Sequence, residues 1–262
     1  MYQAYWGLSH SPFSHASGLL VEQSPQHAEA LARLAFLTEH QSRLGLLSGP
    51  AGSGKSLVLA EFARTQRAAG VAIALTSAAA VTARELLWEI ASQWGANPAD
   101  GDDAGRLWRL ATDRLAELRM EQVPALVLVD DVDAAAPDSL RLLQRLVHVP
   151  DAELTIVAAA RELPYSSQKQ WLHELAELRI ELALWSEEET RNYVQATLAR
   201  AGREQPAFAT GAVSRLFELS AGVPRRVNQL ARLALVAGAG QKLEQVDEHT
   251  VEAVHEELCA AS

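Results

Sequence analysis

The sequence predicts an α/β fold in which helices cover both faces of a central parallel five-stranded sheet, followed by a small all-helical domain. Three observations lead to this prediction. Short apolar runs alternate with helical patterns over residues 44–184, as in parallel sheets. A glycine-rich segment follows the first apolar run, where a buried strand would enter a loop. From Ser186 onward, the pattern changes to one helix after another.

The elements of the α/β part follow from local signals in chain order. Ser24 and Pro25 are typical of a helix N-cap and first turn, so a helix is expected from Pro25 to about His40, after an irregular opening. The capping box Thr82-x-x-Glu85 opens another helix. The expected strands are 44–48, 71–76, 125–129, 154–159 and 178–184, and the other expected helices start near 55 or span 82–94, 104–120 and 139–147.

The helical part opens at a second capping box, Ser186-Glu187-Glu188-Glu189. Its expected helices lie near 190–200, 212–219, 224–237 and 247–259. No internal repeat or long linker suggests a further unit. The expected domains are therefore an N-terminal segment with the first helix (1–42), the α/β domain (43–185) and the helical domain (186–262).

The composition indicates a globular chain with a substantial core. Of the 262 residues, 48% are hydrophobic, and 33 acidic against 23 basic side chains give a formal net charge of −10. A broad positive surface for nucleic acid or an anionic membrane is not expected. A single cysteine, Cys259, favours a reducing compartment. Neither a signal peptide nor a run of about 18 apolar residues is found, so we expect a cytoplasmic chain without a membrane span.

Residues 49–56 match the phosphate-loop pattern G-x-x-x-x-G-K-[ST] in full, between an expected strand and an expected helix. Glycines let backbone N–H groups turn toward phosphate oxygens, and the helix N-terminus adds a positive dipole. Lys55 reaches the β and γ phosphates, and Ser56 ligates magnesium. The alternative is a glycine-rich turn before a helix. The chain has only three lysines, which lowers the probability that a lysine occupies this position of the pattern by chance. The pattern predicts ATP and Mg²⁺ bound by Gly49, Pro50, Ala51, Gly52, Ser53, Gly54, Lys55 and Ser56.

Two adjacent carboxylates, Asp130 and Asp131, end the apolar run 123–129. A P-loop NTPase places there an aspartate that holds magnesium and an acidic residue that orients the attacking water. We assign Asp130 to the metal and Asp131 to the water. A strand followed by a polar turn is the alternative, but the phosphate loop upstream favours function. Asp133 is interpreted as a turn or helix-cap residue.

The sequence resembles the AAA+ ATPases of the ExeA/GspA secretion group, which are related to transposition-associated AAA ATPases. The resemblance runs nearly end to end. It rests on the phosphate loop and acidic pair and on these further segments: Met1-Tyr2, Gly7-Leu8, Pro12-Phe13-Ser14, 27–34, Leu178-Arg179-Ile180, Ser186 to Glu189 with Tyr193, and Gly222 to Asn228. The last is similar to the sensor-2 signature G-x-P-R-x-[IV]-N. The resemblance implies a P-loop NTPase of the AAA+/ASCE class, in which residues 186–262 form the lid.

Two arginines receive roles from this resemblance. Arg225, in the sensor-2 segment, would reach toward the γ-phosphate as the lid closes. Arg179 would be an arginine finger that completes the site of a neighbouring subunit, which implies a homo-oligomer. The alternatives are a helix-surface charge for Arg225 and an exposed strand-end arginine for Arg179.

Two features depart from the family pattern. Asp131 stands where most relatives have glutamate, and its shorter side chain reaches about one methylene less far toward the water, which favours slow turnover. No polar sensor-1 residue ends the strand 154–159, and Arg161 is the nearest candidate. The eight histidines are dispersed and are interpreted as solvent or packing residues.

The leading hypothesis is a magnesium-dependent ATPase whose lid motion and oligomerisation remodel or assemble a protein partner, one related to the envelope or secretion. A second hypothesis is a nucleotide-gated binding switch with weak hydrolysis. A third is a DNA-associated ATPase of the transposition type, which the net charge disfavours.

Overall fold

The computed structural model describes residues 2–13, 24–161 and 169–260. Met1, Ser14 and Glu162, which belong to or adjoin the motifs above, lie outside the described residues. The chain forms two compact units. The sheet unit comprises Glu29–Pro50 and Lys55–Leu182, and the helical unit comprises Met1–Ala28, Ala51–Gly54 and Ala183–Ser262. The domain limits expected from the sequence remain a prediction.

The sheet unit contains the predicted parallel five-stranded sheet, in the order β2-β3-β4-β1-β5. Its strands are β1 Leu44–Ser48, β2 Ala72–Ser77, β3 Ala125–Asp130, β4 Leu154–Ala160 and β5 Leu178–Glu181. β5 is shorter than the expected 178–184, because its partner β1 ends at Ser48, which pairs with Glu181. The strand order brings the carboxyl ends of β1, β3 and β4 to one edge, where ligands bind in such sheets.

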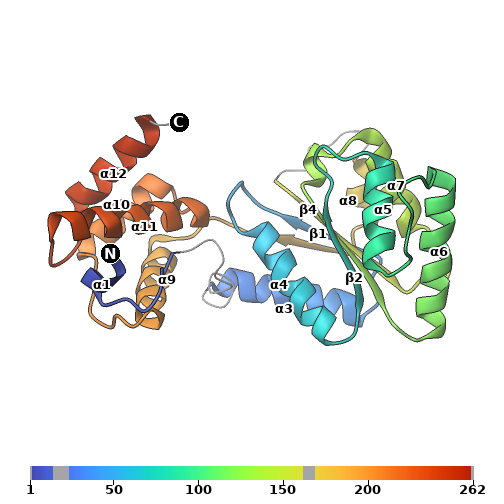
Figure 1. Cartoon of the computed structure of the whole chain (residues 1–262), viewed down its shortest axis with the longest axis horizontal. Helices are drawn as coiled ribbons and strands as arrows, with labels where there is room; N and C mark the ends of the chain where they lie inside the picture. The colour runs from blue at the N-terminus through green and yellow to red at the C-terminus, as the bar shows by residue number, and fades with distance from the viewer. Residues whose placement is uncertain (1, 14–23, 162–168, 261–262) are drawn as a thin grey trace. The chain divides into compact units, whose positions relative to one another are not determined.

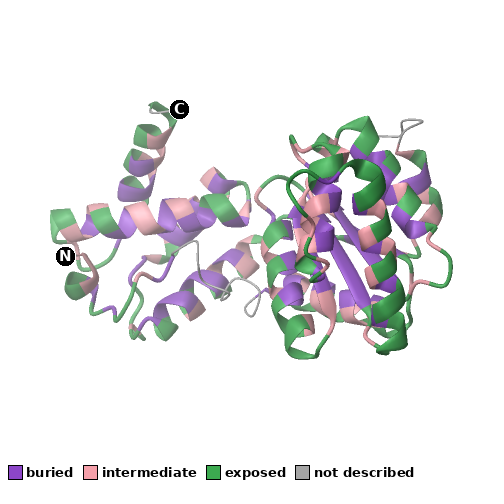
Figure 2. Cartoon of the chain, turned by 45° about the vertical axis from the view of Figure 1, so that its right-hand side comes forward, coloured by how far each residue is buried: buried purple, intermediate pink, exposed green. Residues whose placement is uncertain are grey.

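Helices cover both faces of the sheet (Figure 1). One face carries α3 Pro25–Glu39 and α4 Lys55–Ala68, and the other carries α5 Ala83–Gln93, α6 Ala104–Met120, α7 Pro137–Val147 and α8 Gln170–Leu175. Alternation along β3 serves both cores, because Leu126 and Leu128 pack on the α3 and α4 side while Val127 and Val129 pack on the opposite side. The strands are accordingly the most continuously buried elements (Figure 2).

Local signals located most helices correctly. Both predicted capping boxes are formed, at Thr82 with Glu85 and at Ser186 with Glu189. Three short elements were not predicted: α1 Tyr2–Trp6, the 3-10 helix η1 Val132–Ala134, and α8. The expectation of an irregular opening is therefore wrong for α1. A helix of one or two turns carries too little periodic pattern to be seen in a sequence.

The helical unit contains α9 Glu187–Arg200, α10 Thr210–Ser220, α11 Pro224–Gln241 and α12 Glu248–Ala260, together with α1. Trp6 fixes α1 against α11, because its buried indole Nε1–H donates to the Leu235 carbonyl at 2.7 Å. Arg203 lies over the same ring and donates to the Trp6 carbonyl at 3.0 Å. The start of the chain is thus part of this unit. Within the described ranges, no helix has the length and apolar character needed to cross a bilayer.

Replacing Trp6 by alanine should destabilise the protein, because it removes a buried aromatic ring and the indole hydrogen bond that joins α1 to α11. We expect a loss of about 3 to 5 kcal/mol in the free energy of unfolding, measured by urea denaturation. Met120→Ala is the control, since Met120 is 86% exposed and its truncation should cost less than about 0.5 kcal/mol. Equal midpoints for the two variants would contradict the anchoring of α1 by Trp6.

Candidate functional site

The phosphate loop joins β1 to α4, as the sequence predicted. Gly52 and Gly54 have φ angles of +84° and +105°, which L side chains rarely adopt. Space is also limiting at both positions. A Cβ at Gly52 would lie 2.9 Å from the Val223 side chain, and one at Gly54 would lie 2.4 Å from His27 Nε2. Conformation and close packing therefore both require glycine here.

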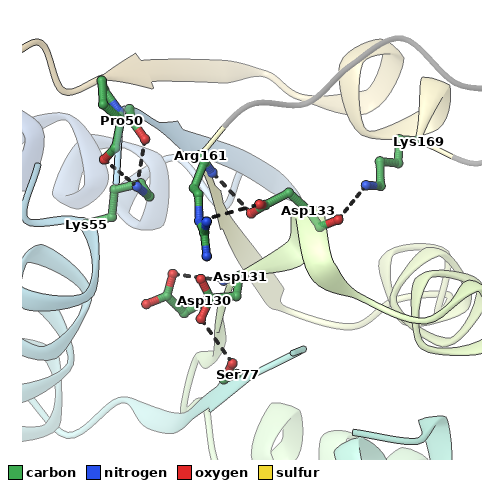
Figure 3. A network of polar contacts seen from close by, with 9 residues as sticks. Pro50, Lys55, Ser77, Asp130, Asp131, Asp133, Arg161 and Lys169 are labelled. Atoms are coloured by element: carbon green, nitrogen blue, oxygen red, sulfur yellow. Dashed lines mark hydrogen bonds and ion pairs between the residues drawn. The ribbon is translucent and has the colours of Figure 1, made fainter. Parts of the chain in front are cut away.

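Lys55 lies in the first turn of α4 with a buried side chain. Its ammonium donates hydrogen bonds to the carbonyls of Gly49 at 2.7 Å and Pro50 at 3.0 Å (Figure 3). Burial lowers the pKa of Lys55 from its ordinary value, while Asp130, Asp133 and Asp131 partly offset this effect. The lysine is thus held by loop carbonyls and faces three carboxylates.

Ser56 and Asp130 come together in the sheet unit, at the start of α4 and the end of β3. The Ser56 hydroxyl donates to Asp130 Oδ2, and Asp130 Oδ1 accepts the Asp131 N–H at 2.8 Å. A hydroxyl and a carboxylate are hard oxygen ligands, and Mg²⁺ is commonly bound through one or two carboxylates together with substrate phosphates. The donor pair therefore fits magnesium.

Asp131 follows β3 with a left-handed backbone, φ 53° and ψ 38°, a conformation that aspartate tolerates better than most residues. Its Oδ2 accepts a hydrogen bond from the Ser77 hydroxyl at 3.4 Å, from the end of neighbouring β2. The structure thus places Asp131 beside Asp130 at the edge where three strands end. Figure 3 shows the two carboxylates near Ser77.

A second polar cluster, which the sequence did not reveal, links the ends of β3 and β4. Asp133 lies in η1, and its Oδ1 accepts the Arg161 N–H at 3.1 Å. Its Oδ2 lies 3.9 Å from Arg161 Nε, and its carbonyl accepts Lys169 Nζ at 2.8 Å. Figure 3 shows the Arg161 side chain extending toward Asp130 and Asp131. Asp133 does occupy a turn, but it also positions Arg161.

The two arginines assigned by resemblance lie in different surroundings. Arg179, in β5, is exposed and donates to the His173 carbonyl at 2.6 Å. Arg225 lies in the first turn of α11, and its backbone N–H donates to the Gly52 carbonyl at 3.3 Å. Within the helical unit, Arg225 is therefore next to the phosphate loop, whereas no described contact joins Arg179 to the loop.

His27 is a contact of the phosphate loop that the sequence did not predict. Its side chain is 1% exposed, and its Nε2 lies 2.8 Å from the Ser53 carbonyl. Burial lowers the pKa of His27, and the Ser53 bond and Glu189 oppose that shift. The sequence did not distinguish His27 from the other seven histidines, because no sequence motif encodes a bond from a side chain to a distant backbone carbonyl. In the sequence analysis, the one signal that included His27 was the resemblance of residues 27–34 to a family segment.

The comparison with protein families assigns an AAA domain to residues 38–163. The chain is also 30% identical over 246 residues to general secretion pathway protein A of Aeromonas hydrophila, which covers 90% of this chain. The chain spans 45% of that relative's length. These matches confirm the resemblance drawn from the motifs.

Solved structures share the fold. The Aeropyrum pernix ORC1 protein, solved in complex with DNA, has a TM-score of 0.68 and 21% identity, with coverage of 92% of this chain and 68% of that one. Cdc6p from Pyrobaculum aerophilum has a TM-score of 0.72 and 16% identity, with coverage of 94% and 70%. At these identities, the likeness supports the α/β fold with its helical region.

The burial of His27 predicts a pH dependence of stability. Its pKa in the folded chain lies below the ordinary 6.5, so the unfolded chain binds more protons as the pH falls through 6.5. Lowering the pH from 7.5 to 5.5 should therefore reduce the thermal midpoint by more in the native protein than in His27→Gln. The negative charge of Glu189 opposes the lowering of the His27 pKa, so Glu189→Gln should steepen the fall. Parallel curves for native protein and His27→Gln would contradict this origin.

Proposed function

We propose that this chain, which carries an AAA domain over residues 38–163 and is similar to general secretion pathway protein A, is a P-loop ATPase of the AAA+ type that binds MgATP at residues 49–56 and hydrolyses it. One observation carries the proposal: the Ser56 hydroxyl, at the end of the phosphate loop, contacts Asp130 at the end of β3. The loop and the acidic strand end thus meet as nucleotide chemistry requires.

Lys55 is the phosphate ligand in this proposal. Its ammonium is bonded to the carbonyls of Gly49 and Pro50, and these bonds are replaceable by phosphate oxygens, which carry more negative charge. Ser56 and Asp130 would hold magnesium, which neutralises charge on the transferred phosphoryl group when bound. The buried Lys55 loses part of its hydration in advance, so its attraction for phosphate is stronger than that of an exposed lysine.

Asp131 would orient the attacking water. Among the described residues, the one group that donates a hydrogen bond to its carboxylate is the Ser77 hydroxyl at 3.4 Å, so the carboxylate can accept a proton or a hydrogen bond from water. It is one methylene shorter than glutamate. The same feature supports a second candidate, a nucleotide-gated switch in which binding drives docking or assembly and hydrolysis is slow.

Arg161 is our candidate for sensor 1. It lies close enough to Lys55 to contribute to the lowering of the lysine pKa, and Asp133 holds its backbone and guanidinium. A cation fixed near the acidic pair is suited to stabilise the charge that develops on the γ-phosphate.

Arg225 and Arg179 complete the proposal. Arg225 would sense the nucleotide from α11, and its exposed side chain is free to do so beside Gly52. Arg179 is exposed on the edge strand β5, where a neighbouring copy would find it, and this supports a homo-oligomer. The relative's name points to a secretion partner, and the ORC1 structure points to DNA. Of these, the net charge of −10 favours a protein partner, and the cytoplasmic location remains a prediction.

Lys55→Ala should abolish measurable MgATP binding, while Asp131→Asn should bind MgATP within about threefold of native protein and lose at least about 100-fold in turnover. Affinity is measured by calorimetry and turnover by phosphate release. Lys242→Gln is the lysine control, since Lys242 caps α11 at its far end. Specific activity should rise with protein concentration if copies complete each other's sites. Tight binding without turnover at every concentration would favour the switch.

Arg161→Ala should lower kcat by roughly 10- to 100-fold and leave MgATP affinity within about threefold, because its charge acts mainly on the transition state. Arg141→Ala is the control, as Arg141 is an exposed arginine of α7 paired with Asp138. If both variants turn over at the native rate, Arg161 is not sensor 1.

A further inference from the structure

Two successive carbonyls of the phosphate loop are held by residues distant in sequence. The Gly52 carbonyl accepts the Arg225 backbone N–H at 3.3 Å, and the Ser53 carbonyl lies 2.8 Å from His27 Nε2. All four residues belong to the helical unit. The phosphate-loop pattern specifies neither partner, because it describes only the loop itself.

Because a trans peptide is planar, a bond that fixes a carbonyl also fixes the direction of the next N–H group. The C=O of one residue and the N–H of the next point in opposite directions across the peptide plane. The described chain has no cis peptide bond. A Ser53 carbonyl fixed toward His27 therefore turns the Gly54 N–H away from the imidazole, and a Gly52 carbonyl fixed toward Arg225 does the same for the Ser53 N–H. Backbone N–H groups of this kind are what a phosphate loop offers to phosphate.

The hydrogen bond also fixes the state of His27. A carbonyl oxygen only accepts, so Nε2 carries the proton and donates it. Burial favours the neutral ring, as its lowered pKa shows. Nδ1 is left with a lone pair and has no hydrogen-bond partner among the described residues. Donation to Ser53 is therefore the one polar bond that the structure gives this imidazole.

Trp185 ties the two supports together. Its backbone N–H donates to the Gly222 carbonyl at 2.9 Å, three residues before Arg225. Its indole Nε1–H donates to the Ser24 hydroxyl at 3.3 Å, three residues before His27. The Trp185 ring lies 6.4 Å from the His27 ring in an edge-on arrangement. At Gly222, a Cβ would lie 2.2 Å from the Trp185 carbonyl oxygen, so this junction is closely packed.

We propose that His27 is a positioning residue of the nucleotide site, which holds the Ser53–Gly54 peptide in its phosphate-binding orientation and is itself fixed through Ser24 and Trp185. The inference rests on the proposed function, since it concerns the same loop. His27 acts through the backbone and contacts no reacting atom. Its effect is therefore on affinity for phosphate groups, whatever base is attached to them.

The test compares native protein with His27→Ala, His27→Gln and His40→Ala. Glutamine places an amide N–H near the position of Nε2, so it can restore the bond. His40 is an exposed histidine one residue beyond α3 that bonds its own helix at Phe36, and it serves as the matched control. Affinities for MgADP and for inorganic pyrophosphate are measured by calorimetry, with thermal unfolding run in parallel.

We expect His27→Ala to weaken both ligands by roughly 3- to 10-fold, His27→Gln to stay within about twofold, and His40→Ala to match native protein. If His27→Ala does not fold, His27→Asn, whose amide is too short to reach Ser53, replaces it. Native affinity for both ligands in the variant that lacks the donor would overturn the inference. A loss of affinity for MgADP alone would also overturn it, and so would a loss of affinity that the glutamine variant does not restore. Failure of the native protein to bind either ligand would instead overturn the proposed function.

Discussion

The backbone of the phosphate loop is the constraint on which the rest of the structure depends. A loop that turns its N–H groups toward an anion must place its carbonyls elsewhere, and buried carbonyls need donors. Gly49 and Pro50 receive theirs from Lys55, while Gly52 and Ser53 receive theirs from Arg225 and His27. Gly52 and Gly54 have positive φ and leave room for Arg225 and His27, because a Cβ at Gly52 would crowd the Arg225 side chain and one at Gly54 would crowd the His27 ring.

The charges at the strand ends follow from the same constraint. A lysine buried in the loop is costly to keep ionised, and Asp130, Asp131 and Asp133 lie where they lower that cost. Parallel strands whose ends share one edge make this arrangement available, since β3 and β4 are neighbours in the sheet. Arg161, held by Asp133, adds a positive charge to this group of carboxylates. The lysine thus follows β1 and its counter-charges lie at or just after the end of β3, with β4 between these two strands in the sheet.

The helical unit depends on packing over long separations in sequence. Trp6 is fixed to Leu235, Trp185 to Ser24 and Gly222, and Tyr193 donates to Asn228 at 2.6 Å. The side-chain bonds among them satisfy the polar atoms of buried aromatic rings. Apolar packing alone would leave these atoms without a hydrogen-bond partner. All of these residues belong to the compact unit that also contains loop residues Ala51–Gly54.

The sequence by itself determined what local patterns and motifs encode. Apolar periodicity gave the five parallel strands, capping boxes gave the starts of α5 and α9, and the phosphate-loop pattern with Asp130 and Asp131 gave the candidate site. The tertiary structure alone decided where β5 ends, that residues 2–6 are helical, and which side chains hold the loop. The Asp133 bond to Arg161 and the His27 bond to Ser53 join residues 28 and 26 positions apart, and a contact of that kind depends on chain folding that no local pattern contains.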